Sequence, residues 1–83
     1  MYKLFLTKTA EKDLKRIDER YQVAINNRFE NLKENPFIGK RLKDNLKEFW
    51  SLREGVYRII YTVNKNDITV IIVTIGHRQG VYK

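Results

Sequence analysis

The sequence predicts an α+β domain of order β-α-α-β-β-β, with a helical hairpin packed on one face of a largely antiparallel, four-stranded sheet. Apolar residues recur at helical spacing in the first half of the chain, whereas the alternation typical of strands dominates the second half. Polar turn sequences separate the expected strands. No repeat, low-complexity tract or linker divides the 83 residues, so we expect residues 1–83 to form a single domain.

The first half is expected to form one short strand and two helices. Residues 2–7 alternate as a strand, and Thr7 and Thr9 can cap the helix that follows. A joint near residues 18–20 would turn the two helices into a hairpin, and the second helix should end before Pro36. The apolar stripes of the two helices are Ala10, Leu14, Ile17 and Tyr21, then Ile25, Phe29 and Leu32.

The second half is expected to form three strands, at residues 47–53, 56–63 and 68–76, separated by turns at residues 54–55 and 64–67. Alternation puts Trp50 and Leu52 of the first strand opposite Phe49, Ser51 and Arg53. In the second strand, Tyr57, Ile59, Tyr61 and Val63 share a face opposite Arg58 and Ile60. The last strand is apolar on both parities, which is typical of a central strand covered on both sides. The aromatic residues expected in the core are Trp50, Tyr57 and Tyr61.

The formal charge of +7 is distributed unevenly. Residues 1–39 carry eight basic and six acidic side chains, a net of +2, whereas residues 40–83 carry nine and four, a net of +5. Lys40, Arg41 and Lys43 cluster in the connection between the helices and the sheet. The excess suggests a polyanionic partner, although a solvated basic surface would have the same composition.

The composition excludes several kinds of catalytic site. There is no cysteine and a single histidine, His77, which removes thiolate zinc sites and Cys–His pairs. No glycine-rich phosphate loop is present, and the few carboxylates are not expected to cluster around magnesium. No apolar run reaches the length of a signal peptide or the ~20 residues of a membrane helix. We therefore expect a cytoplasmic protein without metal or cofactor.

Arginine, tyrosine and histidine side chains suffice for one reaction, the cleavage of RNA. The ribose 2′-hydroxyl is itself the nucleophile, so a protein need only align it with the leaving 5′-oxygen, neutralise the phosphorane oxygens and move protons. Arginine makes bidentate contacts to phosphate, and tyrosine or histidine can transfer a proton or stack on a base. This chemistry needs no metal ion.

Two stretches of the sequence carry a resemblance to a known family. Residues 49–61 read Phe-Trp-Ser-Leu-Arg-Glu-Gly-Val-Tyr-Arg-Ile-Ile-Tyr, and residues 73–82 read Val-Thr-Ile-Gly-His-Arg-Gln-Gly-Val-Tyr. The first resembles the LR-x-x-x-YR-hydrophobic-hydrophobic-Y hairpin of the RelE/ParE toxin superfamily, and the second resembles its H-R-x-x-V-Y ending. The similarity spans nearly the whole chain. The terminal Val-Tyr resembles the RelE type, because the gyrase-poisoning ParE type usually lacks it.

The resemblance implies the toxin of a type II toxin–antitoxin system, a ribosome-dependent endoribonuclease that cuts messenger RNA in the A site through the 2′-hydroxyl. Carried over by position, Arg58 would grip the scissile phosphate, and Arg78 would contact it and protonate the leaving oxygen. Tyr82 would stack on a base or help to activate the 2′-hydroxyl. The other residues expected to face RNA are Arg53, Lys47, His77, Lys40, Arg41 and Lys43.

The general base stays open among Tyr82, Lys47, His77 and a group of the ribosome, because Phe49 and Ser51 stand where well-known members of the superfamily carry lysines. The resemblance also implies a cognate RelB-like antitoxin, bound in a heterodimer or heterotetramer. Two alternatives remain for the function. One is a ParE-like, non-enzymatic inhibitor of DNA gyrase, and the other is an inactive RNA-binding module.

Overall fold

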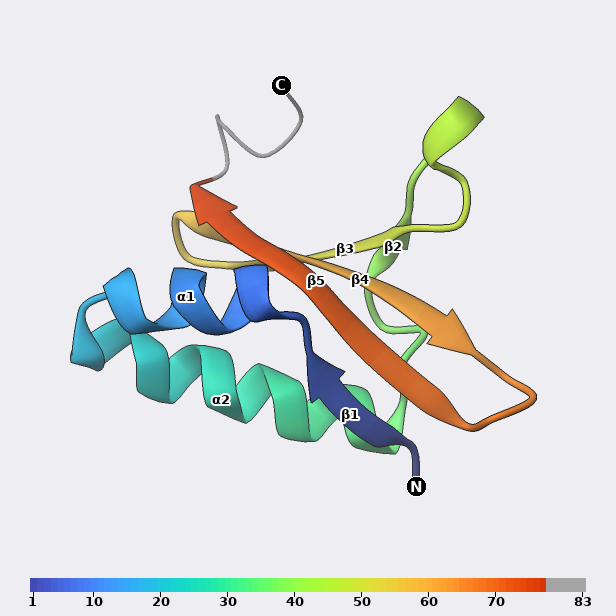
Figure 1. Cartoon of the computed structure of the whole chain (residues 1–83), viewed down its shortest axis with the longest axis horizontal. Helices are drawn as coiled ribbons and strands as arrows, with labels where there is room; N and C mark the ends of the chain where they lie inside the picture. Colours follow the sequence, from blue (N-terminus) through green and yellow to red (C-terminus); the bar gives the residue numbers. More distant parts are fainter. Residues whose placement is uncertain (78–83) are drawn as a thin grey trace.

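The fold was obtained as a computed structural model, which describes residues 1–77. Arg78 and Tyr82, two of the predicted catalytic residues, lie outside the described residues. Figure 1 shows two helices side by side, next to a twisted sheet whose longest strand crosses the molecule diagonally. The elements are β1 (Lys3–Leu6), α1 (Lys8–Arg16), α2 (Glu19–Glu34), β2 (Lys40–Arg41), the 3₁₀ helix η1 (Asp44–Leu46), β3 (Trp50–Glu54), β4 (Tyr57–Asn64) and β5 (Thr69–His77).

The start of α1 is fixed by Thr7, one of the two predicted capping residues. Its Oγ1 accepts a hydrogen bond from the backbone N–H of Ala10 at 3.1 Å and donates to the carbonyl oxygen of Val73 at 2.7 Å. A single hydroxyl therefore caps the helix and ties it to β5. Thr9, the other candidate, lies inside the helix.

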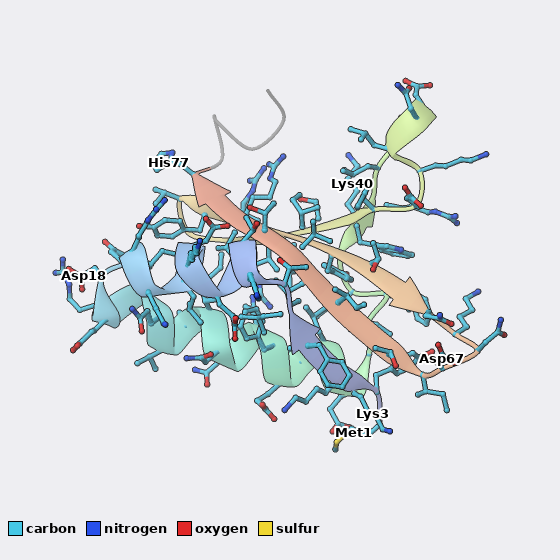
Figure 2. The ribbon with its side chains drawn as sticks, in the orientation of Figure 1. Met1, Lys3, Asp18, Lys40, Asp67 and His77 are labelled. Atoms are coloured by element: carbon cyan, nitrogen blue, oxygen red, sulfur yellow. The ribbon has the colours of Figure 1, made fainter. Side chains whose placement is uncertain are left out.

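The joint between the helices lies at Asp18 (Figure 2), within the predicted range. Its carboxylate accepts from the backbone N–H of Arg20 at 2.9 Å, and this bond, followed by that to the Arg20 guanidinium, lowers the pKa of Asp18. α2 then runs to Glu34 and ends before Pro36, as predicted. Neither helix in residues 1–77 is long and apolar enough to cross a membrane.

The sheet has five strands in the order β1-β5-β4-β3-β2, so the predicted number of four was wrong. β1 is parallel to β5 and the remaining pairs are antiparallel, which confirms a largely antiparallel sheet. The additional strand is β2, in which Lys40 pairs with Ser51 and Arg41 pairs with Trp50. Two residues are too few to show a strand period, and this segment was therefore expected to be irregular.

The core lies between the sheet and the two helices, which pack on one face as predicted. β5 is flanked by β1 and β4, so its central position is confirmed. Its expected cover on both faces was wrong, because Ile71 is 39% exposed on the side away from the helices. The buried side chains of the core are Ala10, Ile17, Ile25, Phe29, Leu32, Leu52, Ile59, Tyr61, Val70, Ile72 and Ile75.

A β-bulge interrupts β5 where it passes β4. Ile60 pairs with Thr74 and Tyr61 pairs with Ile72, which leaves Val73 as the extra residue. Asp13 of α1 holds the bulge, because its Oδ2 accepts from the Thr74 hydroxyl at 2.7 Å and from the next backbone N–H at 3.0 Å. The extra residue shifts the alternation, so that side chains three positions apart, at residues 72 and 75, both enter the core.

Candidate nucleic-acid interface

Two arginines face each other across the β3–β4 hairpin. Arg53 and Arg58 are directly paired positions, and they alternate with the core residues Leu52 and Ile59, so both lie on the side of the sheet away from the helices. On its other flank Arg58 pairs with Gly76 of β5, which has no side chain. Like charges at directly opposed positions repel, and a bound polyanion would relieve that repulsion.

These arginines line an open cavity of about 590 Å³. Lys40 and Lys43 also line it, and the four basic side chains Lys40, Lys43, Arg53 and Arg58 define what we call the basic groove. Its remaining lining is largely apolar and comprises Ile38, Gly39, Leu42, Leu46, Ser51 and Leu52. The groove therefore combines positive charge with apolar surface, the combination that a nucleic-acid strand with phosphates and base faces requires.

A buried tyrosine fixes the segment that enters the groove. The Tyr61 hydroxyl donates to the carbonyl oxygen of Pro36 at 2.8 Å and accepts from the N–H of Gly39 at 3.1 Å. Burial raises the pKa of Tyr61 to about 12, against the opposing effect of the Gly39 N–H. A side chain at Gly39 would meet that hydroxyl and, at 2.7 Å, the carbonyl oxygen of Ser51. Position 39, directly before Lys40, therefore requires glycine.

The opposite side of the hairpin is held by an ion pair. Arg28 of α2 donates from Nε to Glu54 Oε1 at 3.0 Å, and its Nη2 lies 3.4 Å from the carbonyl oxygen of Arg53. The Glu54 side chain therefore lies on the helix side of the hairpin, where it binds Arg28, whereas Arg53 lines the groove. This contact fixes the end of β3 that carries Arg53.

Arg41 and Lys47 are not among the residues that line the groove. The Nε of Arg41 donates to the backbone carbonyl of Lys47 at 2.8 Å, a contact that closes the loop containing η1. Both side chains are exposed. Their predicted contact with RNA stays a prediction.

His77 lies on the other face of the sheet from Arg58. It pairs with Tyr57, whose side chain packs against the core, and the two ring centroids are 6.1 Å apart. Figure 2 shows His77 at the end of β5, far from Lys40. Within residues 1–77 no three His, Cys, Asp or Glu side chains lie together as a potential metal site.

The structure adds two groups that sequence reasoning did not assign to the site. Ser51 lines the groove, and its shared parity with Arg53 was the available signal. Tyr61 was correctly predicted as a core residue, but nothing in the sequence indicated that its hydroxyl would bind the segment before Lys40. Trp50 and Tyr57 pack against the core as predicted.

Comparison with known proteins identifies the family. The family model described as ParE toxin of type II toxin-antitoxin system, parDE, matches residues 4–82. Toxin RelG of Mycobacterium tuberculosis is 32% identical, over 99% of this chain and 97% of that protein. Toxin RelE of the same organism is 33% identical, over 99% and 87%. The M. tuberculosis RelBE2 toxin–antitoxin complex superposes with a TM-score of 0.85 at 33% identity, over 93% of this chain and 91% of that one. The chain belongs to the RelE/ParE superfamily, the toxins of type II toxin–antitoxin systems.

Proposed function

We propose that this toxin is a ribosome-dependent, metal-independent endoribonuclease that cuts messenger RNA in the A site. The basic groove carries the proposal, because Arg53 and Arg58 occupy directly opposed positions on neighbouring strands and both line an open cavity. Guanidinium groups bind the non-bridging oxygens of phosphates through bidentate, charge-assisted hydrogen bonds. The relatives named Toxin RelG and Toxin RelE support a toxin of the RelE type.

The proposed reaction uses the nucleophile that RNA carries. The 2′-oxygen attacks phosphorus, the bond to the 5′-oxygen breaks, and the products are a 2′,3′-cyclic phosphate and a 5′-hydroxyl. A base takes the 2′-proton and an acid supplies a proton to the leaving oxygen. Arg58, with Arg53 beside it, would neutralise the charge that develops on the phosphorane oxygens. Arg78 is proposed as the acid, and Tyr82 as a stacking group or base.

The positions of His77 and Lys47 support one proposal for the general base. His77 lies on the helix side of the sheet next to Tyr57, and Lys47 is exposed outside the groove lining. Both positions favour Tyr82 or a group of the ribosome as the base. A base supplied by the ribosome would also make the activity depend on the ribosome.

The proposed partner is a cognate RelB-like antitoxin in the cytoplasm, bound in a heterodimer or heterotetramer. The similar M. tuberculosis structure is a toxin–antitoxin complex, which supports a partner of this kind. A chain with a formal charge of +7 suits a small acidic protein, since complementary charge speeds association.

The proposal is tested by mapping messenger RNA in a purified translation system. We expect the wild-type protein to produce new 5′-hydroxyl ends at A-site codons, and Arg78→Ala and Tyr82→Phe to reduce their rate of formation. Arg20→Ala is the matched control, because Arg20 is an exposed arginine paired with Asp18 and outside the groove. Binding to ribosomes without new 5′-hydroxyl ends would instead support an inactive RNA-binding module.

A second candidate, inhibition of DNA gyrase, is favoured by one observation, the match to a family model described as ParE. A gyrase inhibitor needs no catalytic cluster, so its toxicity would survive Arg58→Ala and Arg78→Ala. A supercoiling assay with purified gyrase separates the two functions. Inhibition of supercoiling by both variants, with translation unaffected, would contradict the nuclease proposal.

A further inference from the structure

α1 carries a row of basic side chains on its outward side, away from the basic groove. The inward side packs on the sheet through Ala10, which is buried, and Leu14, which is half-buried. The outward side is exposed and contains one carboxylate, that of Glu11. What we call the α1 basic face comprises Lys8, Lys12, Lys15 and Arg16.

Part of this arrangement opposes the stability of the helix, although Lys15 and Arg16 in its last turn suit the helix dipole. Three members of the α1 basic face follow each other at i, i+4 spacing, where like charges repel. Lys8 lies in the first turn, where the helix dipole disfavours a positive charge. The ion pairs found within residues 1–77 involve Arg20, Arg28 and Lys33, and none involves the α1 basic face. Lys8 and Lys12 therefore oppose the local stability of the helix, as expected of charges that serve binding.

We propose that the α1 basic face binds the phosphate backbone of ribosomal RNA while the basic groove holds the message. This inference rests on the proposed function. A helical rise of ~1.5 Å per residue spaces i, i+4 side chains about 6 Å apart, close to the separation of neighbouring phosphates along a strand. Helix α1 lies beside β5 (Figure 1). It packs on the face that carries Ile59, whereas strand alternation puts Arg58 on the other face, so the two surfaces can hold different strands.

The composition of the face favours RNA over an acidic protein as the occupant. Protein interfaces are centred on apolar or aromatic anchors, and the large exposed apolar side chains of residues 1–77 all lie outside α1. A phosphate backbone needs no such anchor, because release of its condensed counterions supplies most of the affinity. A helix whose exposed side carries four basic residues and no large exposed apolar side chain fits that partner.

The test measures binding to purified ribosomes without message, at increasing potassium chloride. The variant Lys8→Gln/Lys12→Gln/Arg16→Gln should lower the slope of log affinity against log salt by about 2 to 3, since each phosphate contact contributes ~0.7–0.9. Cleavage by this variant should keep its rate at saturating ribosomes and need a higher ribosome concentration for half-maximal rate. The charge-conserving variant Lys8→Arg/Lys12→Arg/Arg16→Lys should keep the wild-type slope.

A second triple variant, Arg20→Gln/Lys33→Gln/Lys65→Gln, removes the same charge elsewhere and should leave the slope unchanged. An unchanged slope in the α1 variant, or an equal fall in this control, would overturn the inference. An equal fall in binding to poly-glutamate would also overturn it, because the face would then attract any polyanion. If the α1 variant loses ribosome binding but the wild type cuts no message, the inference stands and the proposed function fails. If the wild type cuts message and the α1 variant keeps its slope, the proposed function stands and this inference fails.

Discussion

The β3–β4 hairpin has two faces that are built from the same strands and differ in what they contribute. On the helix side Leu52, Ile59 and Tyr61 are buried in the core. On the other side Arg53 and Arg58 occupy directly opposed positions and line an open groove. Burial of the first face stabilises the fold, whereas the second presents positive charge to the groove. Adjacent residues of one strand can therefore serve different purposes, one the stability of the fold and the other the activity of the groove. Substitutions at positions 58 and 59 should separate the effect on activity from the effect on stability.

The largest effect is expected on the groove side. Arg58→Ala should lower the rate of message cleavage by about 10²–10³-fold, the usual loss when one preorganised donor to a developing oxyanion is removed. Arg58→Lys should recover part of the rate, because lysine keeps the charge but loses the bidentate geometry. The rates are measured per folded protein, with the folded fraction determined by circular dichroism. Full activity of Arg58→Ala would remove the groove from the mechanism.

The neighbouring position should show the opposite behaviour. Ile59 is fully buried, so Ile59→Ala should lower the free energy of unfolding by about 2–5 kcal/mol, and Ile59→Val by about 0.5–1.5 kcal/mol. The rate of cleavage per folded molecule should stay at the wild-type value. Urea denaturation measures the first quantity and message cleavage the second. A stable but inactive Ile59→Ala protein would show that the two faces are not independent.

Tyr61 connects the two faces, because its ring is in the core and its hydroxyl holds the segment before Lys40. Tyr61→Phe should lower the free energy of unfolding by about 1–3 kcal/mol, since the N–H of Gly39 and the carbonyl of Pro36 lose their partner. The pKa of Tyr61 is raised from 10.0 to about 12 in the folded state. As the pH rises, Tyr61 therefore ionises first in the unfolded chain. The extra stability of the wild type over Tyr61→Phe is complete below pH 10 and lost towards pH 12.

Urea denaturation of the wild type and of Tyr61→Phe between pH 8 and pH 12 tests the direction of this pH dependence. An ordinary phenol has its titration midpoint at about pH 10. The stability gap between wild type and Tyr61→Phe should be constant at the lower pH values and narrow above pH 10. Comparison with the variant cancels the titration of the other tyrosines and lysines. A gap that persists unchanged to pH 12 would show that the folded-state pKa is not raised.

The co-facial arginines could be predicted from the sequence because two simple rules combine there. Residues alternate along each strand, and the two-residue loop at Gly55 and Val56 sets the pairing of Arg53 with Arg58. The parity of His77 follows from the same pairing, through its partner Tyr57. The local sequence pattern is sufficient to predict which face of the sheet a residue lies on, wherever a turn fixes the register and one face is buried.

Other features depended on contacts between residues far apart in the sequence. The bulge at Val73 is held by Asp13, some sixty residues away, and no local pattern specifies such a contact. The two-residue strand at Lys40–Arg41 forms only because β3 offers an edge. Without the bulge, strict alternation over 68–76 could not place both Ile72 and Ile75 in the core, and the strand therefore looked apolar on both faces.

The smallest predicted effects concern the tips of the two hairpins, which adopt positive φ with different residues. Gly55 has φ 60° with nothing within 4 Å of an added Cβ, so Gly55→Ala should cost about 1 kcal/mol through backbone conformation alone. Ile68 has φ 53° and is half-exposed, so Ile68→Gly should stabilise the fold by about 0.5 kcal/mol, the relieved strain less the entropy of glycine. Thermal denaturation measures both. A loss of stability in Ile68→Gly would show that the isoleucine side chain contributes more by packing than its backbone conformation costs.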